Sequence, residues 1–175
     1  MTFGDNASSE NQNPVTVSAS EALAPLQDGR ELIIEALCLG DHFTARRQGG
    51  ELVVGGVWGD DLGADAQRVR EALEPLTDFD FHVEGVATRD AVLLTDLLEW
   101  NGADWTPRPL RERLAELGEI SPVALMPERT TTDMLFVGQA FLDHLRARGA
   151  AGAVVKDPDA PRSAGTTGWR VVAWE

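Results

Sequence analysis

The order of apolar and polar positions along the chain predicts short strands that alternate with a few helices. Runs rich in Val, Ile, Leu and Phe that end at Gly, Pro, Asn or Asp are typical of strands. Such runs cover residues 31–37, 43–47, 52–57, 79–87, 91–100, 122–125, 153–156 and 169–174. Apolar residues spaced three or four positions apart predict helices over residues 64–76, 109–117 and 132–148. In the last helix, the residues expected to point inward are Met134, Leu135, Val137, Phe141, Leu142 and Leu145.

Glycine-containing turns connect several of these segments. Gln48-Gly49-Gly50 and Asn101-Gly102 are typical of tight β-hairpins, because glycine and asparagine tolerate positive φ angles. Gly118 and Gly149 each follow a predicted helix and are expected to end it. Strands that come in hairpin runs, with helices between the runs, indicate an α+β fold with largely antiparallel sheets flanked by helices.

Length and composition indicate one globular domain preceded by a tail. The chain has 175 residues, of which 43% are apolar and 25% are charged, and these values are ordinary for a single domain. Residues 1–16 are polar and predict a disordered tail, and residues 17–175 form the predicted domain. We recognise neither a signal peptide nor an apolar run near the roughly 20 residues of a membrane span. The single cysteine, Cys38, cannot form an internal disulfide, so we expect a cytoplasmic protein.

The charge of the chain restricts its chemistry and its partners. The net charge is −14, which argues against tight non-specific binding to nucleic acid, because phosphate contacts need clustered Lys and Arg. The same charge favours a basic protein partner. Lys156 is the only lysine among the 15 basic residues. A mechanism with a nucleophilic lysine would therefore have to use Lys156.

Other candidate residues have simpler interpretations than a functional site. The three histidines lack the spacing of metal ligands, and the acidic pairs near residues 60 and 80 lack the pattern of a calcium loop, so no metal site is predicted. These residues are His42, His82, His144, Asp60, Asp61, Asp78 and Asp80. Cys38 is interpreted as a core residue. Arg108, Arg111 and Arg113 are expected to pair with Glu112 and Glu116 on the same helix.

An ordered set of motifs occupies the second half of the chain. The last of them is Gly152-Ala-Val-Val-Lys156-Asp-Pro-Asp-Ala-Pro161, followed by Gly165 and Gly168-Trp169. Upstream lie residues 96–104 (DLLEWNGAD) and 108–113 (RPLRER). In this order and spacing, the chain resembles the nucleotidyltransferase (adenylation) domain of ATP-dependent DNA ligases over residues 30–175. We recognise no counterpart of the family's C-terminal OB-fold domain.

The resemblance implies both a fold and a reaction. It implies antiparallel sheets flanked by helices, with ATP bound between the sheets. Members of the family attack the α-phosphate of ATP with a lysine and then pass AMP to a DNA 5′-phosphate. By position, the lysine of the family's Lys-x-Asp-Gly motif corresponds to Leu37, its aspartate to Leu39 and its glycine to Gly40. Leucine has no lone pair with which to attack phosphorus.

The other chemical positions of the family are also largely replaced. Ala151 stands where the resemblance places a metal-binding glutamate, and Val57 stands where it places an arginine. Glu84-Gly85-Val86 corresponds to the family's Asp-Gly-Glu, so the ribose-contacting carboxylate is absent. Val171 and Ala173 occupy the positions of two phosphate-binding lysines. The resemblance therefore leaves only a vestigial nucleotide site, which comprises Gly40, Glu84, Lys156 and Trp169.

These replacements predict a pseudoenzyme without a catalytic residue. We expect a scaffold or interaction module, and a link to DNA repair is implied by the resemblance alone. One alternative is a divergent ligase or nucleotidyltransferase that uses Lys156 or a partner's residues, with ATP and Mg²⁺ as cofactors. A second alternative is a sensor that binds ATP without transferring AMP. A third is an unrelated α+β fold.

Overall fold

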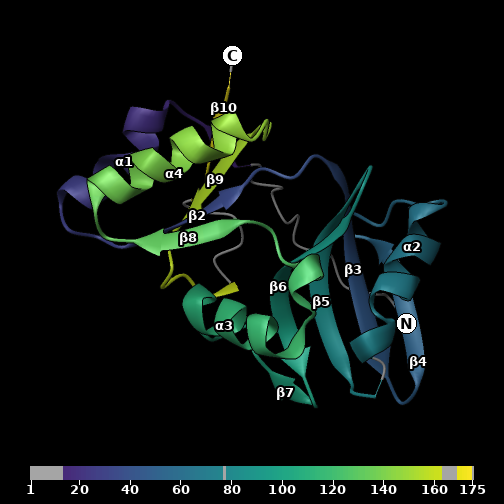
Figure 1. Ribbon diagram of the computed structural model, residues 1–175. Helices are drawn as coiled ribbons and strands as arrows, with labels where there is room; N and C mark the ends of the chain where they lie inside the picture. Colours follow the sequence, from purple (N-terminus) through teal and green to yellow (C-terminus); the bar gives the residue numbers. More distant parts are fainter. Residues whose placement is uncertain (1–13, 77, 163–168, 175) are drawn as a thin grey trace, which may run out of the picture.

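Two largely antiparallel sheets, with helices packed against them, make up the described part of the chain. The computed structural model describes residues 14–76, 78–162 and 169–174. Within these ranges, sheet A has the strand order β1-β10-β9-β2-β8, and sheet B has the order β4-β3-β5-β6-β7. Each described pair of neighbouring strands is antiparallel except the pair of β1 and β10. Figure 1 shows this arrangement, which confirms the predicted α+β class.

The strands of sheet A come from both ends of the chain, whereas those of sheet B follow one another closely. Sheet A contains β1 (Val15–Thr16), β2 (Leu32–Ala36), β8 (Arg129–Thr132), β9 (Gly152–Lys156) and β10 (Arg170–Ala173). Sheet B contains β3 (Gly40–Gln48), β4 (Glu51–Gly56), β5 (Phe81–Thr88), β6 (Val92–Trp100) and β7 (Ala103–Asp104). The described helices are α1 (Ala19–Gln27), α2 (Asp65–Ala72), α3 (Leu110–Ile120) and α4 (Leu135–Ala147). Two 3-10 turns are η1 (Glu74–Leu76) and η2 (Val123–Leu125).

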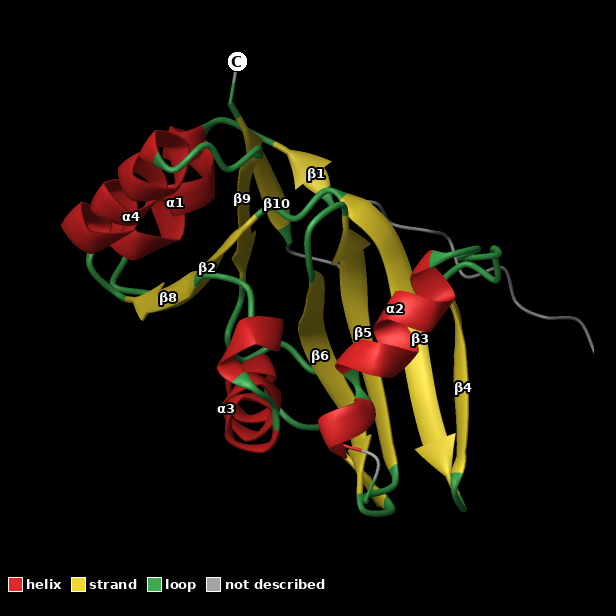
Figure 2. Ribbon diagram, turned by 45° about the vertical axis from the view of Figure 1, so that its right-hand side comes forward, coloured by secondary structure: helices red, strands yellow, loops and turns green. Residues whose placement is uncertain are grey.

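Helices cover one face of each sheet. In Figures 1 and 2, α1 and α4 lie together on sheet A, and α2 lies against sheet B. The core under α1 and α4 includes Ala22, Leu23, Leu26, Ile34, Leu142, Leu145, Val155 and Val172. The core of sheet B includes Phe43, Val69, Leu73, Val83, Leu94, Leu114 and Leu117. Ile33 of β2 belongs to this second core, so successive residues of β2 face different cores, as the alternation of side chains along a strand requires.

Both predicted hairpins are confirmed. Gly49 and Gly50 connect β3 to β4 with φ angles of 58° and 90°. Asn101 and Gly102 connect β6 to β7 with φ angles of 49° and 77°. Positive φ at both central residues matches the right-handed twist of the flanking strands, and glycine or asparagine adopts it at little cost.

Other predicted segments differ from the structure. Residues 122–125, predicted as a strand, contain the 3-10 turn η2 (Val123–Leu125) instead. Gly118, predicted to end a helix, lies inside α3, which continues to Ile120. The sequence pattern missed helix α1 and strand β8. Of the predicted tail, residues 1–13 lie outside the described residues, whereas Val15 and Thr16 form β1 beside β10.

The inward face predicted for α4 is wrong at its first turn. Met134 and Leu135 are 57% and 42% exposed. The buried residues of α4 are Gly138, Leu142 and Leu145. A Cβ atom on Gly138 would lie 2.7 Å from Cδ1 of Leu26, so α1 packs tightly against α4 at this glycine and the buried stripe begins there.

No helix within the described ranges is long and apolar enough to span a bilayer.

Several glycines of the ligase-like motifs lie where the backbone leaves no room for a side chain. A Cβ atom on Gly40 would lie 2.2 Å from the carbonyl oxygen of Ala87. On Gly85 it would lie 2.3 Å from the carbonyl oxygen of Leu93. Because backbone atoms cannot move away as flexible side chains do, these glycines have a packing role that is independent of any chemistry.

We expect Gly85→Ala to lower the free energy of unfolding by about 2–3 kcal/mol, the usual cost of overpacking a filled core. Gly55→Ala is the matched control, because a Cβ atom on Gly55 has no neighbour within 4 Å, and its effect should stay within about 0.5 kcal/mol. Urea unfolding of both variants and the parent measures the difference. Equal stability of the two variants would contradict the close approach at Gly85.

Candidate functional site between the two sheets

The polar residues of interest lie on the faces of the sheets that α1, α2 and α4 leave uncovered. Ile34 and Val155 pack under α1 and α4, so their neighbours Glu35 and Lys156 point to the opposite face of sheet A. On sheet B, Val83 packs in the core with α2, and Glu84 correspondingly points to the other face.

Lys156 is buried in an ion pair. Its Nζ donates to Oε1 of Glu35 at 2.7 Å, and the two side chains are 1% and 4% exposed. The same Nζ lies 4.1 Å from the centre of the Trp169 ring, in a cation–π contact. Lys156 is therefore not a surface residue, and it does not pair with its neighbour Asp157. Asp157 instead lies 3.7 Å from Arg30.

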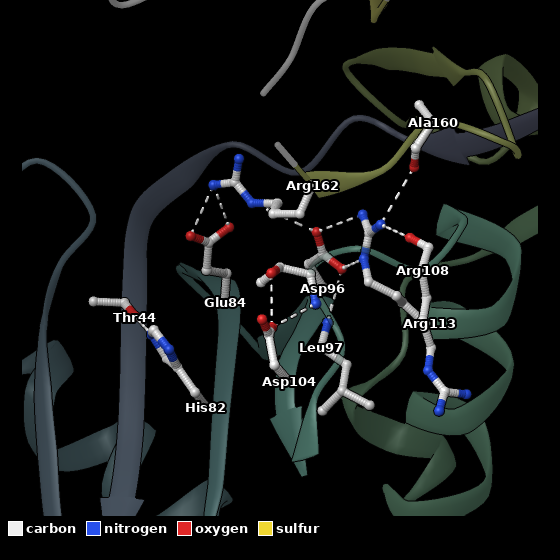
Figure 3. Close-up of polar contacts among 11 residues, drawn as sticks. Thr44, His82, Glu84, Asp96, Leu97, Asp104, Arg108, Arg113, Ala160 and Arg162 are labelled. Atoms are coloured by element: carbon white, nitrogen blue, oxygen red, sulfur yellow. Dashed lines mark hydrogen bonds and ion pairs between the residues drawn. The ribbon is translucent and has the colours of Figure 1, made fainter. Parts of the chain in front are cut away.

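Asp96 and Arg113 form a second buried ion pair, shown in Figure 3. Nε and Nη2 of Arg113 donate to the two carboxylate oxygens of Asp96 at 2.7 and 3.0 Å, and both side chains are 2% exposed. The backbone N–H of Leu97 donates to Asp96 at 2.9 Å. This bidentate geometry gives the buried carboxylate and guanidinium hydrogen-bond partners away from water, and it joins β6 to α3.

The segment that follows β9 places Arg162 on sheet B. Arg162 donates to both carboxylate oxygens of Glu84 at 2.9 and 3.1 Å and lies 3.7 Å from Asp96, as Figure 3 shows. The same segment accepts a hydrogen bond from the first turn of α3: the N–H of Leu110 donates to the carbonyl oxygen of Ala160. Residues 157–162 therefore connect sheet A, α3 and sheet B, and they place the guanidinium of Arg162 against Glu84.

Two histidines occupy the same face of sheet B. Burial is the main cause that lowers the pKa of His42 and of His82, and the negative charge of Glu84 opposes it in both. His82 Nε2 lies 2.7 Å from Oγ1 of Thr44, and His42 meets Trp58 edge-on, with ring centres 5.3 Å apart. Within the described residues, no group of His, Cys, Asp and Glu is arranged to hold a metal ion.

The positions that correspond to the family's nucleophile and metal ligand lie at adjacent strand ends. The N–H of Leu37 donates to the carbonyl of Gly152 at 3.0 Å, and Ala151 directly precedes Gly152. Gly40 begins β3, and Leu39 before it is 66% exposed. Neither Leu37 nor Ala151 supplies a nucleophile or a metal ligand. Gly165 and Gly168 lie outside the described residues.

Sequence reasoning missed Glu35, Asp96 and Arg113, although a signal was present for each. Glu35 and Asp96 are acids inside otherwise apolar strands, and Arg113 lies three positions after Leu110, on the apolar face of α3. A charge at such a position indicates a buried partner. Arg162 had no comparable signal, because it lies in a loop.

The pairing expected for the α3 arginines is confirmed in only one case. Arg108, which lies just before α3, is 3.8 Å from Glu112 of that helix. Arg111 instead pairs with Glu31 and Asp159, and Arg113 pairs with Asp96. Cys38 is partly buried, and burial raises its pKa to about 11, so the side chain is a neutral thiol near pH 7.

We expect Arg113→Met to lower the free energy of unfolding by about 3–5 kcal/mol, because Asp96 would remain buried without its partner. Arg46→Met is the control. Arg46 pairs with Glu99 at 3.1 Å but is 50% exposed, so its loss should cost less than about 1 kcal/mol. Chemical denaturation of both variants tests this, and an Arg113→Met loss as small as that of the control would contradict the role given to the pair.

Comparison with known sequences finds DNA ligases. No family model matches the chain. A protein from Mycobacterium sp. (strain KMS) named "Probable DNA ligase" is 27% identical over 89% of this chain and 35% of its own length. A "Probable DNA ligase" from Mycolicibacterium vanbaalenii is 38% identical over 46% of this chain and 15% of its own. The chain thus spans about a third of the length of the first of these curated relatives.

Comparison with solved structures finds the same kind of protein. A mycobacterial DNA ligase D in complex with ATP superposes with a TM-score of 0.65 at 19% identity, over 83% of this chain and 55% of the ligase. An archaeal ATP-dependent RNA ligase superposes with a TM-score of 0.61 at 15% identity, over 92% of this chain and 47% of that protein. The chain therefore has the fold of the ligase adenylation domain, and its sequence resembles ATP-dependent DNA ligases.

Proposed function

We propose that this domain is a catalytically inactive relative of the ligase adenylation domain and acts as a protein-interaction module. The observation that carries the proposal is that three cations between the sheets are each paired with a carboxylate of this chain. Lys156 is bound to Glu35, Arg113 is bound to Asp96, and Arg162 is bound to Glu84. A triphosphate needs cations that are free to face it.

The replaced positions support the same conclusion. Leu37 lies where the resemblance places the nucleophile, and Ala151, directly before β9, lies where it places a metal ligand. Lys156, the only lysine of the chain, is 1% exposed and its ammonium is held by a carboxylate. Attack on phosphorus would require this nitrogen to leave the carboxylate of Glu35, which would break the buried pair.

A packing role explains why glycines of the motifs are present while the chemical residues are not. Gly40 and Gly85 lie against backbone carbonyls, with no room for a Cβ atom. Ala151, at the position of the metal ligand, is exposed and is under no such packing constraint. A domain that keeps the fold of an enzyme but replaces its reactive residues is suited to binding a partner. Its net charge of −14 favours a partner with a basic surface.

The mycobacterial relatives are named as DNA ligases and one solved neighbour contains ATP, so two other functions are tested with the proposal. A divergent nucleotidyltransferase would form a covalent adenylate, and an ATP sensor would bind ATP without forming one. A link to DNA repair is part of the proposal and follows from these relatives alone.

We expect no protein-bound label after incubation with α-labelled ATP and Mg²⁺ or Mn²⁺, followed by denaturing electrophoresis. An active ATP-dependent DNA ligase in a parallel lane controls for the assay, and Lys156→Ala runs beside the parent protein. Label on the parent that disappears in Lys156→Ala would show that Lys156 is a nucleophile, and the proposal would then be wrong.

A further inference from the structure

A small pocket lies between sheet A and α3, beside the Glu35–Lys156 pair. Its volume is about 240 Å³, and it is lined by Ile33, Arg111, Leu114, Ala115, Arg129 and Thr131. Glu35 and Ile33 share a face of β2, and their partners Arg129 and Thr131 share the same face of β8. The pocket is therefore next to the buried pair and has its own set of lining residues.

The charges at one end of this pocket are unbalanced. Glu35 carries one negative charge, but two cations meet it: Lys156 at 2.7 Å and Arg129 at 3.4 Å. Within the described residues, Glu35 is the only ion-pair partner of Arg129. Nε and Nη2 of Arg129 are buried and make no hydrogen bond to the described part of the chain. A buried excess of positive charge is unfavourable unless an anion comes close to it.

The other walls of the pocket are largely apolar. Ile33, Leu114 and Ala115 form this part of the lining. Arg111 lies at the outer side, where it is 41% exposed and already pairs with Glu31 and Asp159. The acids that pair with Arg111 oppose a ligand of high negative charge. A ligand with one negative charge and a compact apolar body fits these apolar walls and the cation at one end of the pocket.

We propose that this pocket binds a small organic monocarboxylate, with the carboxylate at the Arg129 guanidinium and the apolar body against Ile33, Leu114 and Ala115. Since a water molecule occupies about 30 Å³, the pocket volume suits a compact molecule such as benzoate. This activity is separate from nucleotide transfer, because no residue of the vestigial nucleotide site lines the pocket.

Titration of the ¹⁵N-labelled protein with sodium benzoate tests the proposal. We expect saturable shifts of the amide signals of Ile33, Leu114 and Ala115. Benzamide, which has the same ring without the charge, should bind at least about 10-fold more weakly, because it cannot make a charge-assisted contact with the guanidinium. Equal binding of benzoate and benzamide, or no saturable shift with benzoate, would overturn the proposal.

Two variants locate the site. Arg129→Met should weaken benzoate binding at least about 10-fold, whereas Arg148→Met, which removes a 67% exposed arginine, should leave it unchanged. Arg129→Lys keeps the charge and should recover part of the affinity, and it serves if Arg129→Met fails to fold. Benzoate binding that both Arg129 variants leave intact would place the ligand elsewhere. Labelling by ATP would contradict the proposed function without altering this result.

Discussion

The carboxylate of Asp96 is the group on which the arrangement of the two sheets depends. Asp96 lies in the middle of strand β6 and is 2% exposed, so its charge is stable only with partners in fixed positions. Arg113 supplies two hydrogen bonds from α3, and Arg162 approaches to 3.7 Å from the segment after β9. Asp96 thereby holds α3 on sheet B. It also interacts with the segment that follows β9 of sheet A.

The fold could be predicted from sequence wherever the signal is local. Asn101-Gly102 specifies a hairpin through φ angles that few other residues adopt. Strand β8 was missed because its sequence, Arg-Thr-Thr-Thr, has no apolar alternation, and it exists only because β2 offers it a hydrogen-bonding edge. Helix α1 was missed despite the capping box that Ser18 and Glu21 form, because Pro25 inside it indicates a break. Contacts between distant parts of the chain decide these elements.

The ion pairs of the site could not be predicted from the sequence, although the residues that replace the family's motif can be read from it. Leu37 can be placed against the family's motif by counting residues, and no fold can make leucine a nucleophile. The partner of Lys156 is 121 positions away in the sequence, and no local pattern connects the two. Arg162 and Glu84 are likewise 78 positions apart. Counting residues against the family's motif therefore leads us to expect no nucleophile at Leu37, whereas the pairing of Lys156 and Arg162 with acids of the same chain is visible only in the structure.

The central claim is that the cations between the sheets are occupied by this chain's own carboxylates and are not available to a triphosphate. Calorimetric titration with ATP and Mg²⁺ at low ionic strength tests it most directly, because low salt favours any phosphate contact that can form. The account predicts no saturable heat up to millimolar ATP, which corresponds to less than about 4 kcal/mol of binding free energy. Saturable binding with a micromolar dissociation constant, abolished by Lys156→Ala, would contradict it.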